Sequence, residues 1–223
     1  MIPNRLLILY TLIALPTFLF AQTYVGFKGG INRSQSNFVF NLNPNTITAS
    51  GNLDGFYFSI PVEVTGKKLI DFLTEVALIS DGSILSVQRQ AESRTYNNTI
   101  LFVKVPLLAK VKLLQHKDYE LSMIGGIVPA YALDVKSTYF TLADLRTFID
   151  VPISFEQAGI RRFDAGIALG LNTHKVIAKG WKITLDLRYQ FGLLNLENRT
   201  ELTTTTESFS LALGILTPIF SNK

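Results

Sequence analysis

The sequence has no cysteine in its 223 residues and little charge. The missing cysteines exclude disulfide bonds, thiolate metal sites, cysteine nucleophiles and a lipid-modified N-terminal cysteine. Charged residues make up 17% of the chain, whereas roughly a quarter of an average soluble protein is charged. Together with a mean hydropathy of +0.28, this composition favours a membrane protein.

Long apolar runs are missing after the N-terminus. There, Arg5 precedes the apolar stretch Leu6–Leu15, Pro16 interrupts it, and the small residue Ala21 follows. This order predicts a secretory signal peptide over residues 1–21 and a mature domain over residues 22–223. A membrane anchor is the alternative, but Leu6–Ala21 contains a proline and is shorter than the roughly 18–20 residues that span a bilayer.

Patterns for enzymatic chemistry and for nucleic-acid binding are also scarce. The net charge is +4, yet the basic residues form neither a run nor a stripe, so no nucleic-acid partner is expected. Hydrolases and acyltransferases need a histidine near a serine and a carboxylate. The two histidines, His116 and His174, fall in predicted short turns and are expected to be solvated. We therefore expect a non-enzymatic protein without a metal or cofactor.

Period-two alternation dominates the mature chain. In "GFYFSIPVEV" (Gly55–Val64), Phe56, Phe58 and the following Ile and Val residues alternate with Tyr57 and other polar residues, as in a strand with one apolar face. The pattern predicts eight strands, at Thr23–Asn32, Gly55–Thr65, Leu69–Ser80, Thr99–Leu113, Tyr119–Leu133, Arg162–Thr173, Lys182–Leu193 and Ser208–Leu216.

The connections between these strands alternate in length, as in outer membrane barrels with long extracellular loops and short periplasmic turns. An even strand number would place both chain ends in the periplasm. The long connections are Arg33–Asp54, Asp81–Asn98, Asp134–Arg161 and Leu194–Glu207, and the short ones are Gly66–Lys68, Leu114–Asp118 and His174–Trp181. The first half of Asp81–Asn98 could also extend the preceding strand.

The small residues indicate which face of the strands points inward. Glycines such as Gly26, Gly30, Gly126 and Gly170 share the face that carries the charges, and an eight-stranded barrel has a narrow interior filled by side chains. The bulky apolar face would then meet lipid. The predicted fold class is all-β, an eight-stranded antiparallel up-and-down transmembrane β-barrel. The expected partner of its outer wall is outer-membrane lipid. The alternative is a secreted soluble barrel resembling a lipocalin, or an antiparallel sandwich.

Aromatic residues near the strand ends fit the interfacial girdles of such barrels, although ordinary packing would place aromatics there too. Charges on the inward face predict a polar network in the lumen. A structural network of ion pairs is one interpretation, and an ion or proton path is the other. We expect Asp164 and Arg188, on adjacent strands, to pair. The predicted network residues are Lys28, Glu63, Glu75, Lys104, Lys110, Asp164, Asp186 and Arg188, and the candidate girdle residues are Tyr24, Tyr119, Tyr131, Trp181 and Phe220.

Several segments are similar to motifs of the PorT-like outer-membrane β-barrel family. They occur in the family's order: "VGFKGGINRS" (Val25–Ser34), "VKVPLLAKVK" (Val103–Lys112), "GGIVPAYAL" (Gly125–Leu133), "RFDAGIALGLN" (Arg162–Asn172) and "LRYQFGLLNL" (Leu187–Leu196). The resemblance implies an eight-stranded barrel in the outer membrane of a Gram-negative bacterium. The family takes its name from a member linked to type IX protein secretion, which implies an accessory role in secretion. The end of the chain departs from outer-membrane barrels with a terminal aromatic, because three residues follow Phe220.

The remaining candidates for function are the connections between strands, because rigid scaffolds carry binding specificity on their loops. The connection Asp134–Arg161 contains Tyr139, Phe140, Phe148 and Phe155, which suit either packing onto the barrel or contact with a partner. We therefore expect an outer-membrane protein with a structural or interaction role. Its protein partners would bind long extracellular loops or periplasmic turns.

Overall fold

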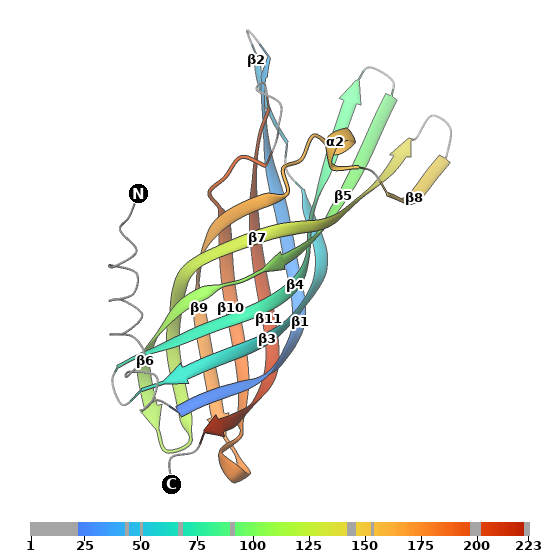
Figure 1. Ribbon diagram of the computed structural model, residues 1–223. Helices are drawn as coiled ribbons and strands as arrows, with labels where there is room; N and C mark the ends of the chain where they lie inside the picture. The colour runs from blue at the N-terminus through green and yellow to red at the C-terminus, as the bar shows by residue number, and fades with distance from the viewer. Residues whose placement is uncertain are drawn as a thin grey trace, which may run out of the picture.

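The computed structural model describes residues 22–42, 45–49, 51–66, 69–89, 92–141, 146–152, 154–196 and 202–220. Antiparallel strands form one sheet that closes on itself (Figure 1). Closure comes from β11 (Leu202–Phe220), which pairs with β10 (Lys182–Gly192) on one side and with β1 (Gln22–Leu42) on the other. The predicted signal peptide lies outside the described residues and stays a prediction.

Eight strand positions make up the ring, which confirms the predicted number and the predicted all-β, up-and-down fold. From β1 the order runs through β3, β4, the pair β5 and β6, then β7, β9, β10 and β11. The bounds of the other ring strands are Asn52–Thr65 (β3), Ile70–Arg89 (β4), Glu92–Lys104 (β5), Leu107–His116 (β6), Tyr119–Thr141 (β7) and Phe163–Val176 (β9).

Strands β5 and β6 share one ring position, because both pair with β4 and with β7. The sequence predicted one continuous strand, Thr99–Leu113. The structure interrupts it at Val105 and Pro106, since proline has no N–H for the ladder. The Val105 N–H still donates to the Pro129 carbonyl across the gap, at 2.9 Å.

The two faces of the strands lie as the small and bulky residues predicted. Phe56 and Phe58 are each 47% exposed on the outside, whereas Tyr57, Ser59 and Glu63 are buried inside. Leu73 and Ile79, which break the alternation, are also buried in the interior. The glycines have a further role, because a Cβ on Gly26 or Gly30 would collide with carbonyl groups of β11. Glycine therefore permits the close approach of β1 and β11.

The strands continue far past the region where apolar and polar residues alternate. β7 has 23 residues and so spans about 75 Å, while a tilted membrane strand needs roughly 9–11 residues. The predicted loops Arg33–Asp54 and Asp134–Arg161 are therefore wrong in part. They contain the ends of β1 and β7, the added strands β2 (Asn45–Ala49) and β8 (Arg146–Pro152), and the short helix α2 (Phe155–Ala158).

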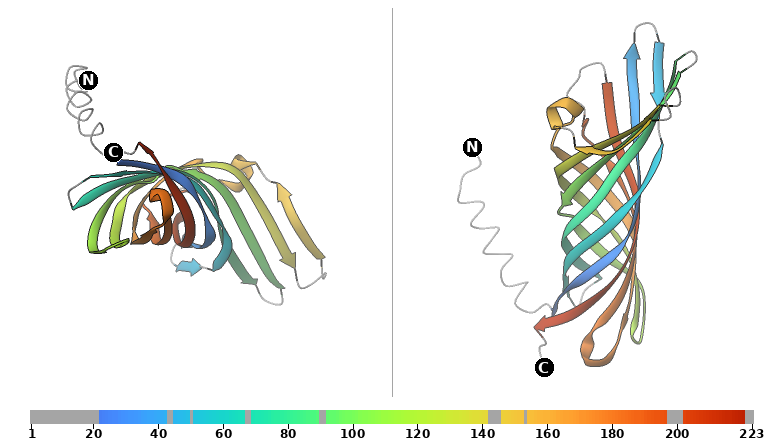
Figure 2. Two further views of the ribbon diagram at one scale, coloured as in Figure 1. Left: turned by 90° about the horizontal axis from the view of Figure 1, so that it is seen from below. Right: turned by 90° about the vertical axis from the view of Figure 1, so that its right-hand side faces the viewer.

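The barrel has two unlike ends (Figures 1 and 2). At the short-turn end, β1 begins, β11 ends, and tight connections join β3 to β4, β6 to β7 and β9 to β10; the last includes the 3-10 turn η1 (Ala178–Gly180). At the opposite, long-hairpin end, the extended strands β4, β5, β7 and β8 lean away from the barrel. No helix within the described ranges combines the length and apolar character needed to cross a membrane.

Candidate functional site: the charged lumen

The barrel interior is the candidate site, and it collects all eight residues predicted for it. Each of them is at most 4% exposed, although they come from strands on every side of the ring. Burying a charge costs several kcal/mol unless a partner compensates it. The partners of each buried charge therefore decide whether the lumen is a stable ionic network or has uncompensated charges. The eight residues are Lys28, Glu63, Glu75, Lys104, Lys110, Asp164, Asp186 and Arg188.

A central cluster joins two cations to two carboxylates. Lys28 Nζ lies 2.6 Å from Asp186 Oδ2 and 3.5 Å from Glu75 Oε2. Arg188 donates from Nη2 to Asp186 Oδ2 at 2.9 Å, and its Nη1 forms a very short ion pair with Glu75 Oε1. The Ser59 hydroxyl donates to Glu75 Oε2 at 3.0 Å. Each charge in this central cluster thus meets at least two polar partners.

The Arg188–Glu75 pair crosses the whole lumen. Glu75 belongs to β4 and Arg188 to β10, and these strands are four ring positions apart in either direction. They therefore lie on opposite walls of the barrel. The ion pair spans the lumen at that level, and the phenol of Tyr57 lies beside it, 3.4 Å from Arg188 Nη1.

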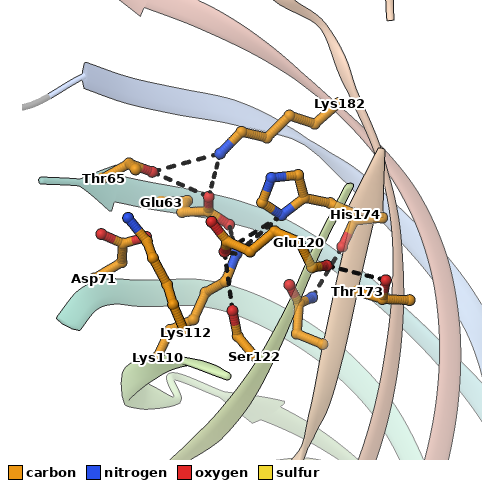
Figure 3. A network of polar contacts seen from close by, with 12 residues as sticks. Glu63, Thr65, Asp71, Lys110, Lys112, Glu120, Ser122, Thr173, His174 and Lys182 are labelled. Carbon is orange, nitrogen blue, oxygen red and sulfur yellow. Dashed lines mark hydrogen bonds and ion pairs between the residues drawn. The ribbon is translucent and has the colours of Figure 1, made fainter. Parts of the chain in front are cut away.

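A second group, the lower cluster, lies toward the short-turn end (Figure 3). Glu63 receives Lys182 at Oε1 (2.6 Å) and Lys110 at Oε2 (3.3 Å). Lys110 Nζ also lies 3.1 Å from Glu120 Oε1 and 3.2 Å from His174 Nδ1, which accepts from the ammonium group. Five strands therefore meet through side chains at this level.

Two outcomes in the lower cluster correct the sequence predictions. His174 is buried inside β9 and not solvated in a turn, because β9 continues past the predicted end at Thr173. His116 is exposed, as expected. Tyr24, a candidate for the interfacial girdle, is buried in the lumen with its ring centroid 3.7 Å from Lys182 Nζ. The girdle candidates Tyr119, Tyr131 and Trp181 are exposed on the outside.

Toward the long-hairpin end, Lys104 has its own partners. Its Nζ lies 2.6 Å from Asp81 Oδ2 and donates to Gln190 Oε1 at 3.2 Å, while Asn32 donates to Asp81 Oδ1 at 2.6 Å. The predicted network omits Asp81, because the sequence places this residue at the start of the connection Asp81–Asn98, whose first half could also extend the strand. In the structure β4 continues past Ser80, and Asp81 follows Ile79 as the next inward-facing residue.

The expected pair Asp164–Arg188 is wrong. The residues do lie on adjacent strands, but the register sets Arg188 opposite Gly170, six residues from Asp164, which is about 20 Å along the strand. Asp164 instead accepts from the Thr206 hydroxyl at 3.1 Å and from the Ala165 N–H at 2.8 Å. Strand adjacency alone could not reveal this offset.

Beside Lys104, Asp81 and Asp164, part of the lumen wall is apolar. We call this group the mouth cluster, and the segment that contains α2 lies against it. Ser154 and Gln157 cap α2 reciprocally, at 3.1 and 3.0 Å, and the Arg161 N–H donates to the Leu196 carbonyl at 2.7 Å. The aromatic connection therefore packs onto the barrel in part. The mouth cluster comprises Ile100, Phe102, Ala130, Ala132, Val135 and Leu196, with Phe155, Ala158 and Ile160 packed against it.

The chemistry of the lumen is that of a compensated ionic network. Across the described ranges, no group of three or more His, Cys, Asp or Glu residues is arranged to hold a metal ion. The contacts described for His174 are with Lys110 and Glu120, and the Ser122 hydroxyl donates to Glu120 at 2.9 Å. These groups satisfy one another, and their geometry favours structural stabilisation.

Comparisons with known proteins agree with this architecture. The family model described as "Outer membrane protein beta-barrel domain" matches residues 20–198, and a search of curated proteins gave no significant match. The outer membrane protease OmpT of Escherichia coli is similar in structure, with a TM-score of 0.55, 8% identity, and coverage of 89% of this chain and 97% of OmpT. OprG of Pseudomonas aeruginosa has a TM-score of 0.42 and 11% identity, covering 90% of this chain and 97% of OprG.

The likeness to OmpT concerns the fold alone, because 8% identity carries no information about activity. The family model covers most of the chain, including all but one of the ring strands. The chain therefore belongs to the outer membrane protein β-barrel domain family.

Proposed function

We propose that this protein is a closed, non-enzymatic barrel of the outer membrane with a structural and interaction role. The Arg188–Glu75 ion pair carries the proposal, because it joins opposite walls of the lumen. The charges around it are compensated, and the mouth cluster packs part of the lumen toward the long-hairpin end. In this reading the short-turn end faces the periplasm and the long-hairpin end faces the medium.

A narrow ion conduit is the second candidate, because charged side chains line the interior over much of its length. Conductance in planar bilayers separates the two. We expect no discrete current steps from the wild-type protein, with insertion verified by the different gel mobility of boiled and unboiled samples. Reproducible steps of one defined conductance would contradict a closed barrel.

Membrane residence itself can be tested by fractionation. Exposed phenylalanines and leucines cover the outer wall. We therefore expect that detergent extracts the protein from the membrane fraction and that its gel mobility changes on heating. A soluble, lipocalin-like secreted barrel would instead be recovered from the periplasm or the medium without detergent. That result would overturn the membrane proposal.

The interaction role rests on the long-hairpin end, where β8 pairs with β7 and extends the sheet beyond the ring. A photo-crosslinking residue at exposed Lys136 on β7 should capture a protein partner in intact cells, whereas the same residue at outward-facing Ile183 should give no protein adduct. Equal crosslinking at both positions would contradict a specific surface.

The resemblance to the PorT-like family supports a more specific role, as an accessory to type IX secretion. In a bacterium with that system, loss of the protein should reduce the export of type IX substrates, and a plasmid copy should restore it. Unchanged export in the deletion strain would contradict the secretion role and leave the structural role in place.

A further inference from the structure

The short-turn end of the barrel carries an unbalanced group of positive charges. Lys117 lies in the β6–β7 turn, Lys179 lies in η1, and Lys175 lies on β9 just before its end; all three are exposed. Within the described part of this rim, the exposed acidic residue is Asp118. The lumen, by contrast, pairs its cations with carboxylates. We call Lys117, Lys175 and Lys179 the basic rim.

Backbone geometry singles out two of these lysines. Lys117 has φ = 49° and Lys179 has φ = 62°, and across the described ranges they are the two residues other than glycine with positive φ. Glycine adopts this left-handed conformation freely, whereas a residue with a Cβ is strained there. Backbone strain at two turns of the same barrel end suggests that the lysine side chains there have a function. The shared feature of these side chains is a positive charge at the tip of a turn.

The basic rim borders the apolar outer wall. Leu113, Leu114 and Tyr119 are exposed within four residues of Lys117, and Trp181 is exposed two residues after Lys179. Lys175 Nζ lies 4.9 Å from the Tyr119 ring centroid. Tyrosine and tryptophan concentrate where a barrel wall meets lipid headgroups. In a barrel that spans the outer membrane, this position places the lysines at the level of the headgroups.

From this arrangement we infer that the basic rim binds anionic phospholipid headgroups of the periplasmic leaflet. The inference rests on the membrane location in the proposed function. The ammonium groups would donate to headgroup phosphate oxygens while Tyr119 and Trp181 pack beside the glycerol region. An acidic protein partner is less favoured by the geometry, because the lysines adjoin the lipid-facing wall and its interfacial aromatics.

The chain offers its own reporter, since Trp181 is the single tryptophan in the sequence. The protein would be reconstituted into phosphatidylcholine bilayers that contain a minor fraction of one lipid brominated near the headgroup end of its acyl chains. Quenching of Trp181 by brominated phosphatidylglycerol is then compared with quenching by brominated phosphatidylcholine. One lysine near an anionic surface corresponds to roughly a fivefold preference, so we expect the three lysines of the basic rim together to give a preference for phosphatidylglycerol of more than about fivefold.

The variants distinguish an effect of lysine charge on lipid preference from an effect of changed barrel stability. The double variant Lys117→Gly/Lys179→Gly removes two charges and relieves two strained backbones, so it should lose most of the preference without becoming less resistant to urea. Lys175→Arg keeps the charge and should keep the preference, and Lys136→Gln, at the opposite end, is the matched control and should also keep it. The preference should vanish at about 1 M salt, where the Debye length is about 3 Å.

Three results would count against the inference. If neither brominated lipid quenches Trp181, the barrel is not in the bilayer and the proposed function fails with the inference. If both lipids quench Trp181 equally at low salt, the barrel is in the bilayer and the lipid inference alone is overturned. A preference of the wild-type size in the double glycine variant would also overturn it.

Discussion

The lumen is filled in two different ways along its axis. In the central cluster Lys28 compensates Glu75, and in the lower cluster Lys110 compensates Glu63. In the mouth cluster, Phe102, Leu196 and their neighbours exclude water by apolar packing. The ionic part is specific, since each charge depends on particular partners. The apolar part depends on volume and tolerates exchange of similar residues. The difference predicts which substitutions the barrel can survive.

The largest effect is expected from breaking the central cluster on one side. Glu75→Ala leaves Arg188 and Lys28 buried with one carboxylate between them, so the free energy of unfolding should fall by about 3–5 kcal/mol. Urea titration of the refolded barrel in lipid vesicles, read by gel mobility, measures the loss. Asp164→Asn is the control, because hydrogen bonds from Thr206 and Ala165 hold that carboxylate, and its loss should be about 1 kcal/mol. Equal losses for the two variants would contradict the special role of the central cluster.

A smaller effect is expected in the mouth cluster. Leu196→Ala removes a buried side chain and should cost about 2–4 kcal/mol, depending on how far the α2 segment relaxes into the cavity. Leu196→Met keeps the volume and should cost less than about 1.5 kcal/mol. The same urea titration compares the two. Equal destabilisation by both would mean that packing volume does not govern this part of the lumen.

The smallest effect is expected outside the lumen. Arg33 Nε lies 2.8 Å from Asp54 Oδ1, with both side chains exposed. Because solvent screens such a pair, Arg33→Ala should cost less than about 1 kcal/mol, and the difference from wild type should shrink further as salt is added. A loss as large as that of Glu75→Ala would break the contrast between buried and exposed pairs.

The sequence predicts the number of strands well, and it predicts which face of each strand points inward. The reason is that apolar and polar residues alternate with period two in a strand that is exposed on one face. "GFYFSIPVEV" shows this: its phenylalanines lie outside, and Tyr57, Ser59 and Glu63 lie inside. Segments rich in Ser, Thr, Asn and Asp favour loops. The ends of β1 and β7 and the strands β2 and β8 lie in such segments and therefore read as loops.

The pairing of charges within the lumen could not be derived in the same way. Which two charges pair depends on the register between strands and on how far each side chain reaches across the lumen. The residue pattern of a single strand contains neither kind of information. Arg188 thus meets Glu75 from the opposite wall and not Asp164 from the neighbouring strand. His174 and Asp81 were missed because strands β9 and β4 extend beyond the predicted ends.

The central claim is that ion pairs across the lumen hold its walls together, and a double-mutant cycle on Glu75 and Arg188 tests it most directly. The free energy of unfolding would be measured for the wild type, Glu75→Ala, Arg188→Ala and the double variant in one lipid. We expect the double variant to lose less than the sum of the single variants, with a coupling energy of about 2–3 kcal/mol. Losses that add to within about 0.5 kcal/mol would contradict the claim.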